Sequence, residues 1–72
     1  MSTNDQIEVA INGDIRSIPN GLTIRQLLAS LDLDPARVAV ELDRRIVKAP
    51  DWAATSIASG ARLEIVQFVG GG

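Results

Sequence analysis

The sequence predicts an α+β domain in which a mixed sheet of four to five strands packs on one helix. Short segments of alternating apolar and polar residues, typical of half-buried strands, occur on both sides of one segment with helical spacing. The 72 residues are enough for one small core but not for two domains. We expect residues 1–6 to form a loose N-terminal extension, residues 7–69 the domain, and residues 70–72 a flexible glycine tail.

The first third of the domain predicts a β-hairpin. Apolar residues alternate with polar or small ones over residues 7–11, which indicates a strand with one buried face. Asn12-Gly13 follows, and both residues tolerate the positive φ of a two-residue hairpin turn. We expect the return strand over residues 14–18, although its isoleucines do not alternate strictly, and a turn at residues 19–21.

One helix is expected after this turn. Thr23 is a suitable N-cap, and Gln26 three residues later completes a capping box. Leu22 and Leu27 flank the cap at the positions of a hydrophobic staple. The helix should end near Leu31, before Asp34-Pro35, and its apolar residues share one face: Ile24, Leu27, Leu28 and Leu31.

The second half predicts three more strands. Residues 38–42 alternate again, Asp43-Arg44 forms a turn, and residues 45–47 form a short strand. A helical turn over residues 50–54 contains Trp52, which we assign to the core in preference to an interface. A turn at Ser59-Gly60 then precedes the last strand, residues 62–68.

Composition excludes several kinds of chemistry. The sequence has no cysteine and no histidine, so it has no disulfide, thiolate metal site, cysteine nucleophile, histidine base or side-chain persulfide. Carboxylates are not clustered, and we therefore expect no catalytic residue, no metal site and no enzymatic activity of its own. The net charge of −2 with mixed signs does not favour nucleic acid as a partner. No apolar run approaches the roughly 20 residues that span a membrane, and the polar start lacks a signal-peptide pattern, so we expect a cytoplasmic protein without a membrane partner.

The sequence ends in Gly70, Gly71 and Gly72. Because glycine has no Cβ, such a tail can enter a tunnel too narrow for side chains, with a reactive carboxylate at its tip. The alternative is a frayed end without function.

The last strand presents a second candidate site. Leu63 and Ile65 share one face, which we expect to point inward, and Glu64, Val66 and Phe68 share the other. We interpret the outward face as partner-binding, with Phe68 as the anchor, because aromatic residues dominate binding hot spots. The alternative is that Phe68 folds back over the sheet edge as core.

The order of elements and several motifs resemble the ThiS-type sulfur carriers, which have the β-grasp, or ubiquitin-like, fold. The resemblance covers residues 7–72, and its most specific part is Leu63–Gly72, an E-I-V-x-F-V run that leads into the glycines. Other matching segments are Asn12-Gly13, residues 23–28, residues 40–47 and Asp51-Trp52. One departure is Ala61, where such carriers often have aspartate.

The resemblance implies a function for the tail. Gly72 would be adenylated by an E1-like adenylyltransferase that uses ATP and magnesium, with Gly70 and Gly71 giving clearance in its channel. A persulfide donor would then convert the Gly72 carboxylate to a thiocarboxylate, and thiazole synthase would receive the sulfur for the thiazole ring of thiamine. The carrier itself would bind no cofactor. Two alternatives remain: a carrier for molybdopterin or cysteine biosynthesis, and a ubiquitin-like interaction module with an inert tail.

Overall fold

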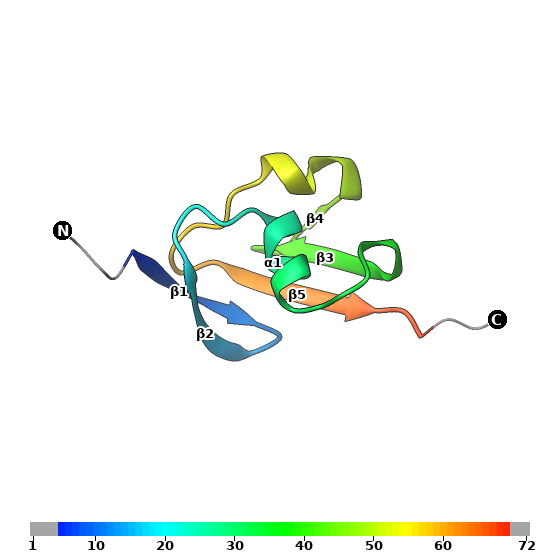
Figure 1. The fold of residues 1–72 in the computed structure, drawn as a ribbon. Helices are drawn as coiled ribbons and strands as arrows, with labels where there is room; N and C mark the ends of the chain where they lie inside the picture. The colour runs from blue at the N-terminus through cyan, green and yellow to red at the C-terminus, as the bar shows by residue number, and fades with distance from the viewer. Residues whose placement is uncertain (1–4, 70–72) are drawn as a thin grey trace.

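The computed structural model describes residues 5–69 and forms a five-stranded sheet with one α-helix (Figure 1). The strands are β1 (Gln6–Ile11), β2 (Asp14–Pro19), β3 (Val38–Leu42), β4 (Arg45–Val47) and β5 (Arg62–Gln67). The helix α1 (Ile24–Ser30) packs on one face of the sheet, and two 3-10 turns, η1 (Pro35–Arg37) and η2 (Ala49–Ala54), join the remaining elements. The predicted α+β arrangement is confirmed.

Strand β5 occupies the centre of the sheet, whose order is β2-β1-β5-β3-β4. It pairs in parallel with β1 and antiparallel with β3, so the sheet is mixed as predicted. The antiparallel register runs from Leu42 opposite Leu63 to Val38 opposite Gln67. The strand that leads into the glycine tail is therefore hydrogen-bonded to a neighbour on each side.

Turn residues at both hairpins adopt the conformation that their sequence predicts. Asn12 has φ 50° and Gly13 has φ 88°, which is the two-residue turn expected between β1 and β2. Asp43 and Arg44 repeat this geometry between β3 and β4 with φ 49° and 70°. Arginine rarely adopts such a φ, so the strand pairing on both sides imposes it.

The start of β1 corrects the predicted domain boundary. Gln6, which we placed in the extension, is the first residue of β1, and its side-chain oxygen accepts a hydrogen bond of 2.9 Å from the Ser17 hydroxyl. Asp5 accepts bonds from Asn20 through both its backbone and its side chain. Both polar residues are thus held by β2 and the turn after it, because hydrogen bonding fixes residues that the apolar pattern does not include. Residues 1–4 lie outside the described part of the sequence.

Helix α1 begins as predicted. The Thr23 hydroxyl accepts from the Gln26 backbone N–H, and the Gln26 side chain accepts from the Thr23 N–H. The capping box is therefore confirmed, and so is the end of the helix at Leu31, its C-cap. Its buried face consists of Ile24, Leu27 and Leu28.

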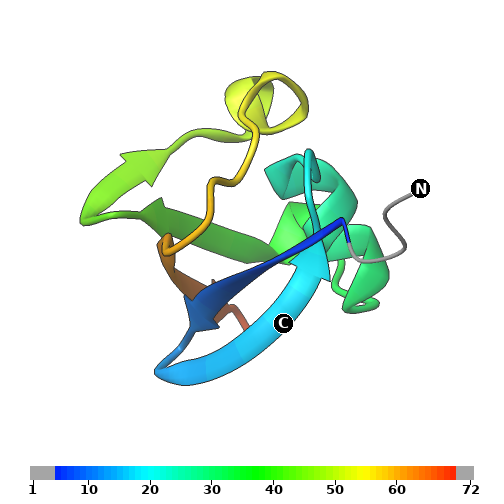
Figure 2. The same cartoon turned by 90° about the vertical axis from the view of Figure 1, so that its left-hand side faces the viewer.

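The core lies between α1, the sheet and η2, as Figures 1 and 2 show from two directions. Trp52 of η2 is 3 % exposed, and its indole N–H donates a 2.7 Å hydrogen bond to the Val47 carbonyl. The assignment of Trp52 to the core is thus confirmed. The core cluster consists of Val9, Ile11, Ile18, Ile24, Leu27, Leu28, Val38, Val40, Trp52, Ile57, Ala61, Leu63 and Ile65.

Candidate functional site at the end of strand β5

The outer face of β5 carries the three residues predicted to bind a partner. Leu63 and Ile65 are buried, whereas Glu64 is exposed, Val66 is 55 % exposed and Phe68, one residue beyond the strand, is 54 % exposed. The predicted orientation of the strand is confirmed. Phe68 is not part of the core cluster and does not fold back into it, so about half of its surface is available to a partner.

The sheet and its neighbours hold the backbone as far as Phe68. The Phe68 N–H donates a 2.7 Å hydrogen bond to the Arg37 carbonyl at the end of η1. Val69, the next residue, is 94 % exposed. Residues 70–72, where we predicted the modified glycine and the two clearance glycines, lie outside the described residues.

A carboxamide 53 residues away in the sequence fixes the middle of β5. The Asn12 side-chain oxygen accepts from the Ile65 N–H at 2.7 Å, and its amide nitrogen donates to the Ile65 carbonyl at 3.1 Å. The Asn12 backbone N–H also donates to the Leu63 carbonyl at 2.9 Å. The Asn12 carboxamide therefore pairs with the Ile65 peptide as another backbone peptide group of β1 would. The parallel pairing between β1 and β5 thus extends beyond the end of β1.

Asp43 fixes the other end of β5 in a similar way. Its carboxylate accepts from the Arg62 N–H at 2.9 Å, and its own N–H donates to the Arg62 carbonyl at 2.8 Å. From the sequence, Asn12 and Asp43 were predicted only as turn residues. No local spacing reveals these contacts, since both join segments that are distant in the sequence.

The outer face of the sheet carries two carboxylates in register near the start of β5. Glu41 of β3 lies directly opposite Glu64 of β5, and with Arg44 and Arg62 they line a shallow hollow of about 280 Å³. Within residues 5–69 the one ion pair joins Arg37 to Asp34 at 3.7 Å, so neither glutamate has an ion-pair partner there. Like charges directly opposite on a sheet destabilise it.

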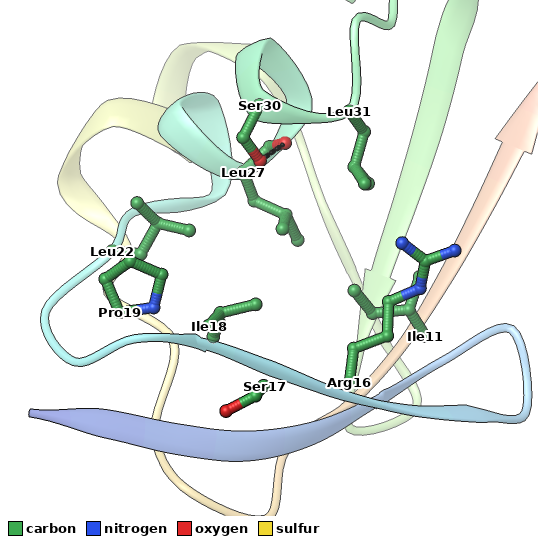
Figure 3. Close-up of a pocket in the computed structure, with 9 residues that line it drawn as sticks. All are labelled: Ile11, Arg16, Ser17, Ile18, Pro19, Leu22, Leu27, Ser30 and Leu31. Carbon is green, nitrogen blue, oxygen red and sulfur yellow. Dashed lines mark hydrogen bonds between the residues drawn. The ribbon is translucent and has the colours of Figure 1, made fainter. Parts of the chain in front are cut away.

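A second hollow is lined by no carboxylate. The hollow between α1 and β2 has a volume of about 340 Å³ and is lined mostly by apolar residues, with Arg16 as the charged one (Figure 3). Residues 5–69 contain no group of three or more side chains that could hold a metal ion. Within the same part of the sequence, none of the helices has the length and hydrophobicity needed to cross a bilayer.

Ala61 is the position that departs from the family pattern. It is 5 % exposed in the core, and its carbonyl accepts a 2.9 Å hydrogen bond from the Ala10 N–H. An alanine fits this buried turn, and the backbone contact with β1 does not depend on the side chain.

Comparison with known proteins decides the family. The family model described as ThiS family matches residues 4–72, nearly the whole sequence. The chain belongs to the ThiS family. The resemblance stated from the sequence is thereby confirmed.

Solved structures agree with this assignment. The crystal structure of a thiamine biosynthesis protein (ThiS) from Geobacter metallireducens superposes with a TM-score of 0.79 at 26 % identity, covering 92 % of this chain and 100 % of that one. An NMR structure of a thiamine biosynthesis protein from Geobacter metallireducens gives a TM-score of 0.75 at 28 % identity, covering 92 % and 88 %. The β-grasp fold expected for a ThiS-family protein is confirmed.

Two relatives are larger proteins. A thiazole synthase from Paramagnetospirillum magneticum is 38 % identical over 66 residues, and one from Magnetococcus marinus is 30 % identical over the same length. The match covers 92 % of this chain but only 20 % of each relative, so the chain spans about a fifth of their length.

An uncharacterized protein, ycf40, from Porphyra purpurea is 30 % identical, with 96 % of this chain and 97 % of that protein covered. These comparisons assign no role to single residues, so the roles of Glu64, Val66, Phe68 and the tail glycines remain predictions.

Proposed function

We propose that this ThiS-family protein is the sulfur carrier of thiamine biosynthesis and that its cargo is bound at Gly72. In the cytoplasm, an E1-like adenylyltransferase uses ATP and magnesium to adenylate the Gly72 carboxylate. A persulfide donor then converts the adenylate to a thiocarboxylate. Thiazole synthase takes the sulfur for the thiazole ring.

The observation that carries this proposal is that the backbone is held as far as Phe68, directly before an exposed Val69. Hydrogen bonds hold the backbone at Arg62, Ile65 and Phe68, and Val69 is then almost fully exposed. A rigid domain that ends in a thin arm presents a terminal group at a defined place, which lowers the entropic cost of reaction inside a partner's active site. Gly70 and Gly71 follow Val69 in the sequence and add no side-chain volume.

The chemistry requires activation by a partner. An α-carboxyl group with a pKa of roughly 3.3–3.7 is ionised at neutral pH and is a poor electrophile. Adenylation releases pyrophosphate and turns it into a mixed anhydride with AMP as leaving group. The outer sulfur of a donor persulfide attacks the carbonyl carbon and AMP leaves, which gives an acyl disulfide. A second thiol, of the donor or of a thiol reductant, then attacks the donor-side sulfur, so that the thiocarboxylate is released and the donor side ends as a disulfide. Oxyanion stabilisation, the magnesium ion and the nucleophile all come from the partners, so the carrier is their substrate and not a catalyst.

We assign docking of the activating enzyme to Glu64, Val66 and Phe68. Val66 and Phe68 supply an exposed apolar surface on the same face, directly before the tail. A contact there holds the domain while the glycines enter the channel. The likeness to segments of proteins named thiazole synthase supports thiazole synthase as the recipient.

Intact mass spectrometry tests the proposal. The protein is incubated with ATP, magnesium, an E1-like adenylyltransferase and a persulfide donor. We expect the mass gain that corresponds to replacing one oxygen by sulfur. A variant with one alanine added after Gly72 serves as the matched control and should not react at Gly72. An unchanged mass with an enzyme that thiolates another ThiS-family carrier would contradict the proposal.

The recipient is tested separately. The thiocarboxylate form is offered to a thiazole synthase and, in parallel, to a molybdopterin synthase lacking its own carrier. Sulfur transfer only to the first supports thiamine biosynthesis, whereas transfer only to the second would refute it.

The docking surface is tested with Phe68→Ala against Ile15→Ala. Ile15 is 70 % exposed on β2, the edge strand beyond β1, and is the control for loss of an exposed apolar side chain. We expect Phe68→Ala to raise the KM for the carrier in adenylation by about tenfold or more, as for a hot spot. Equal KM values for the two variants would refute the assignment.

A further inference from the structure

The same reactive dipeptide occurs twice in the sequence, in two very different settings. Asn12-Gly13 forms the β1–β2 turn, and Asn20-Gly21 lies in the turn that follows β2. We propose that Asn20 is a spontaneous deamidation site of the folded protein, whereas Asn12 is protected by its contact with β5. This inference does not depend on the proposed function.

Deamidation at Asn20 needs only the protein and water. The Gly21 backbone nitrogen attacks the carbonyl carbon of the Asn20 carboxamide and forms a new C–N bond. The bond from this carbon to the amide nitrogen breaks, and ammonia leaves with the proton from the Gly21 nitrogen. Water then opens the resulting succinimide at either carbonyl, giving aspartate or isoaspartate. A following glycine favours the attack, because it has no Cβ to hinder the approach.

The Asn20 carboxamide is weakly held. Among the described residues it makes one hydrogen bond, in which its amide nitrogen donates to the exposed Asp5 carboxylate at 3.2 Å. The surrounding turn is closed by a long 3.3 Å bond from the Leu22 N–H to the Pro19 carbonyl. Gly21 has φ 87° and, like Gly13, has no atom beyond its chain neighbours within 4 Å of where its Cβ would be, so the two sites differ in how the carboxamide is held and not in the space at the glycine. The carboxamide and its attacking nitrogen can therefore rearrange by opening one exposed turn.

The Asn12 carboxamide is held on both sides. Its oxygen and its nitrogen both bond to the Ile65 peptide, at 2.7 and 3.1 Å. Attack by the Gly13 nitrogen would require both bonds to break at the central strand of the sheet. Local opening of such a site costs more free energy than opening of an exposed turn, and the reaction rate falls with the population of the open state.

Reaction at Asn20 changes the start of the sheet. The new carboxylate faces the Asp5 carboxylate, with which the amide had been hydrogen-bonded. The two negative charges repel each other, so the side-chain contact that holds residue 5 beside β2 is lost. In the isoaspartate product the backbone also gains one methylene in the turn.

Peptide mapping measures both sites in one sample. The intact protein is incubated in mildly alkaline buffer, with and without concentrated guanidinium chloride, and is then digested with trypsin. Cleavage after Arg16 and Arg25 puts Asn12 and Asn20 on different peptides. In guanidinium the two sites should react at similar rates. In the native protein Asn20 should react about tenfold faster than Asn12, since opening at Asn12 breaks an additional hydrogen bond within the sheet. The proposal is overturned if Asn12 reacts as fast as Asn20, or faster, in the native protein. It is also overturned if Asn20 stays intact in the native protein while the unfolded protein reacts.

The variant Asp5→Ala adds an independent check. It removes the acceptor of the Asn20 amide and should raise the native rate at Asn20 while leaving that at Asn12 unchanged. Native Trp52 fluorescence verifies that the variant is folded. An unchanged Asn20 rate would refute the role assigned to Asp5, and an equal rise at both sites would show that the whole fold, not the turn, controls the reaction.

Discussion

Replacing Asn12 by glycine removes the contact between the β1–β2 turn and β5 without altering the turn. Glycine adopts the φ of 50° observed at this position, so the hairpin geometry is kept. The two hydrogen bonds to the Ile65 peptide are lost, and each contributes about 1 kcal/mol. The greater freedom of glycine in the unfolded state adds about 0.4–1 kcal/mol. We therefore expect Asn12→Gly to lower the free energy of unfolding by about 2–3 kcal/mol.

The control is Asn20→Gly, which introduces the same glycine before another glycine. It removes only one exposed hydrogen bond and should cost about 0.5–1 kcal/mol, mostly through the unfolded state. Urea titration followed by Trp52 fluorescence gives both values, because Trp52 is buried and is the only tryptophan. A difference of about 2 kcal/mol corresponds to roughly 8–16 °C in Tm for a domain of this size. If the free energies of unfolding of the two variants differ by less than about 0.5 kcal/mol, the Asn12 carboxamide does not hold β5.

Three further predictions concern the helix, the charged face and the tail. Thr23→Ala removes the side-chain cap of α1 and should lower the free energy of unfolding, measured by urea titration, by about 1 kcal/mol. An unchanged free energy of unfolding would mean that the bond from the Thr23 N–H to the Gln26 side chain is sufficient. Glu41→Gln removes the like charge opposite Glu64 and should raise the free energy of unfolding by about 0.2–1 kcal/mol, less in high salt, whereas a loss of stability would show that the nearby arginines already compensate it. Gly71→Ala should leave unfolding unchanged but reduce ATP–pyrophosphate exchange by the activating enzyme, and normal exchange would argue against a narrow channel.

Local signals in the sequence predicted the elements well. Alternation of apolar and polar residues located the strand ends within a residue or two. Turns and helix caps were predictable because each depends on the backbone conformation and hydrogen bonds of no more than four consecutive residues. The parity of β5 followed from the same rule, so the exposure of Val66 and Phe68 could be predicted without a structure. Gln6 was missed because the hydrophobic pattern begins only at Ile7, whereas its place in β1 is given by its register opposite Pro19 of β2.

Long-range contacts could not be predicted in this way. Asn12 and Ile65 are 53 residues apart, and nothing in the Asn12-Gly13 dipeptide distinguishes a free carboxamide from one that continues a ladder. The same holds for Arg37, whose backbone carbonyl holds Phe68. In each of these contacts at least one partner is a backbone N–H or C=O group. Because nearly every residue type has these groups, the composition and spacing of the partner segment do not reveal the contact.

The central position of β5 determines how the domain responds to force. A pull on the C-terminal end of β5 along its axis acts on a strand that is paired with β1 on one side and β3 on the other. Such a pull loads the hydrogen bonds of both ladders in shear, and they must break together and not one after another. A tail attached to an edge strand could be peeled away one bond at a time. The domain can therefore bear a load at this end that would unravel a sheet whose last strand lay at the edge.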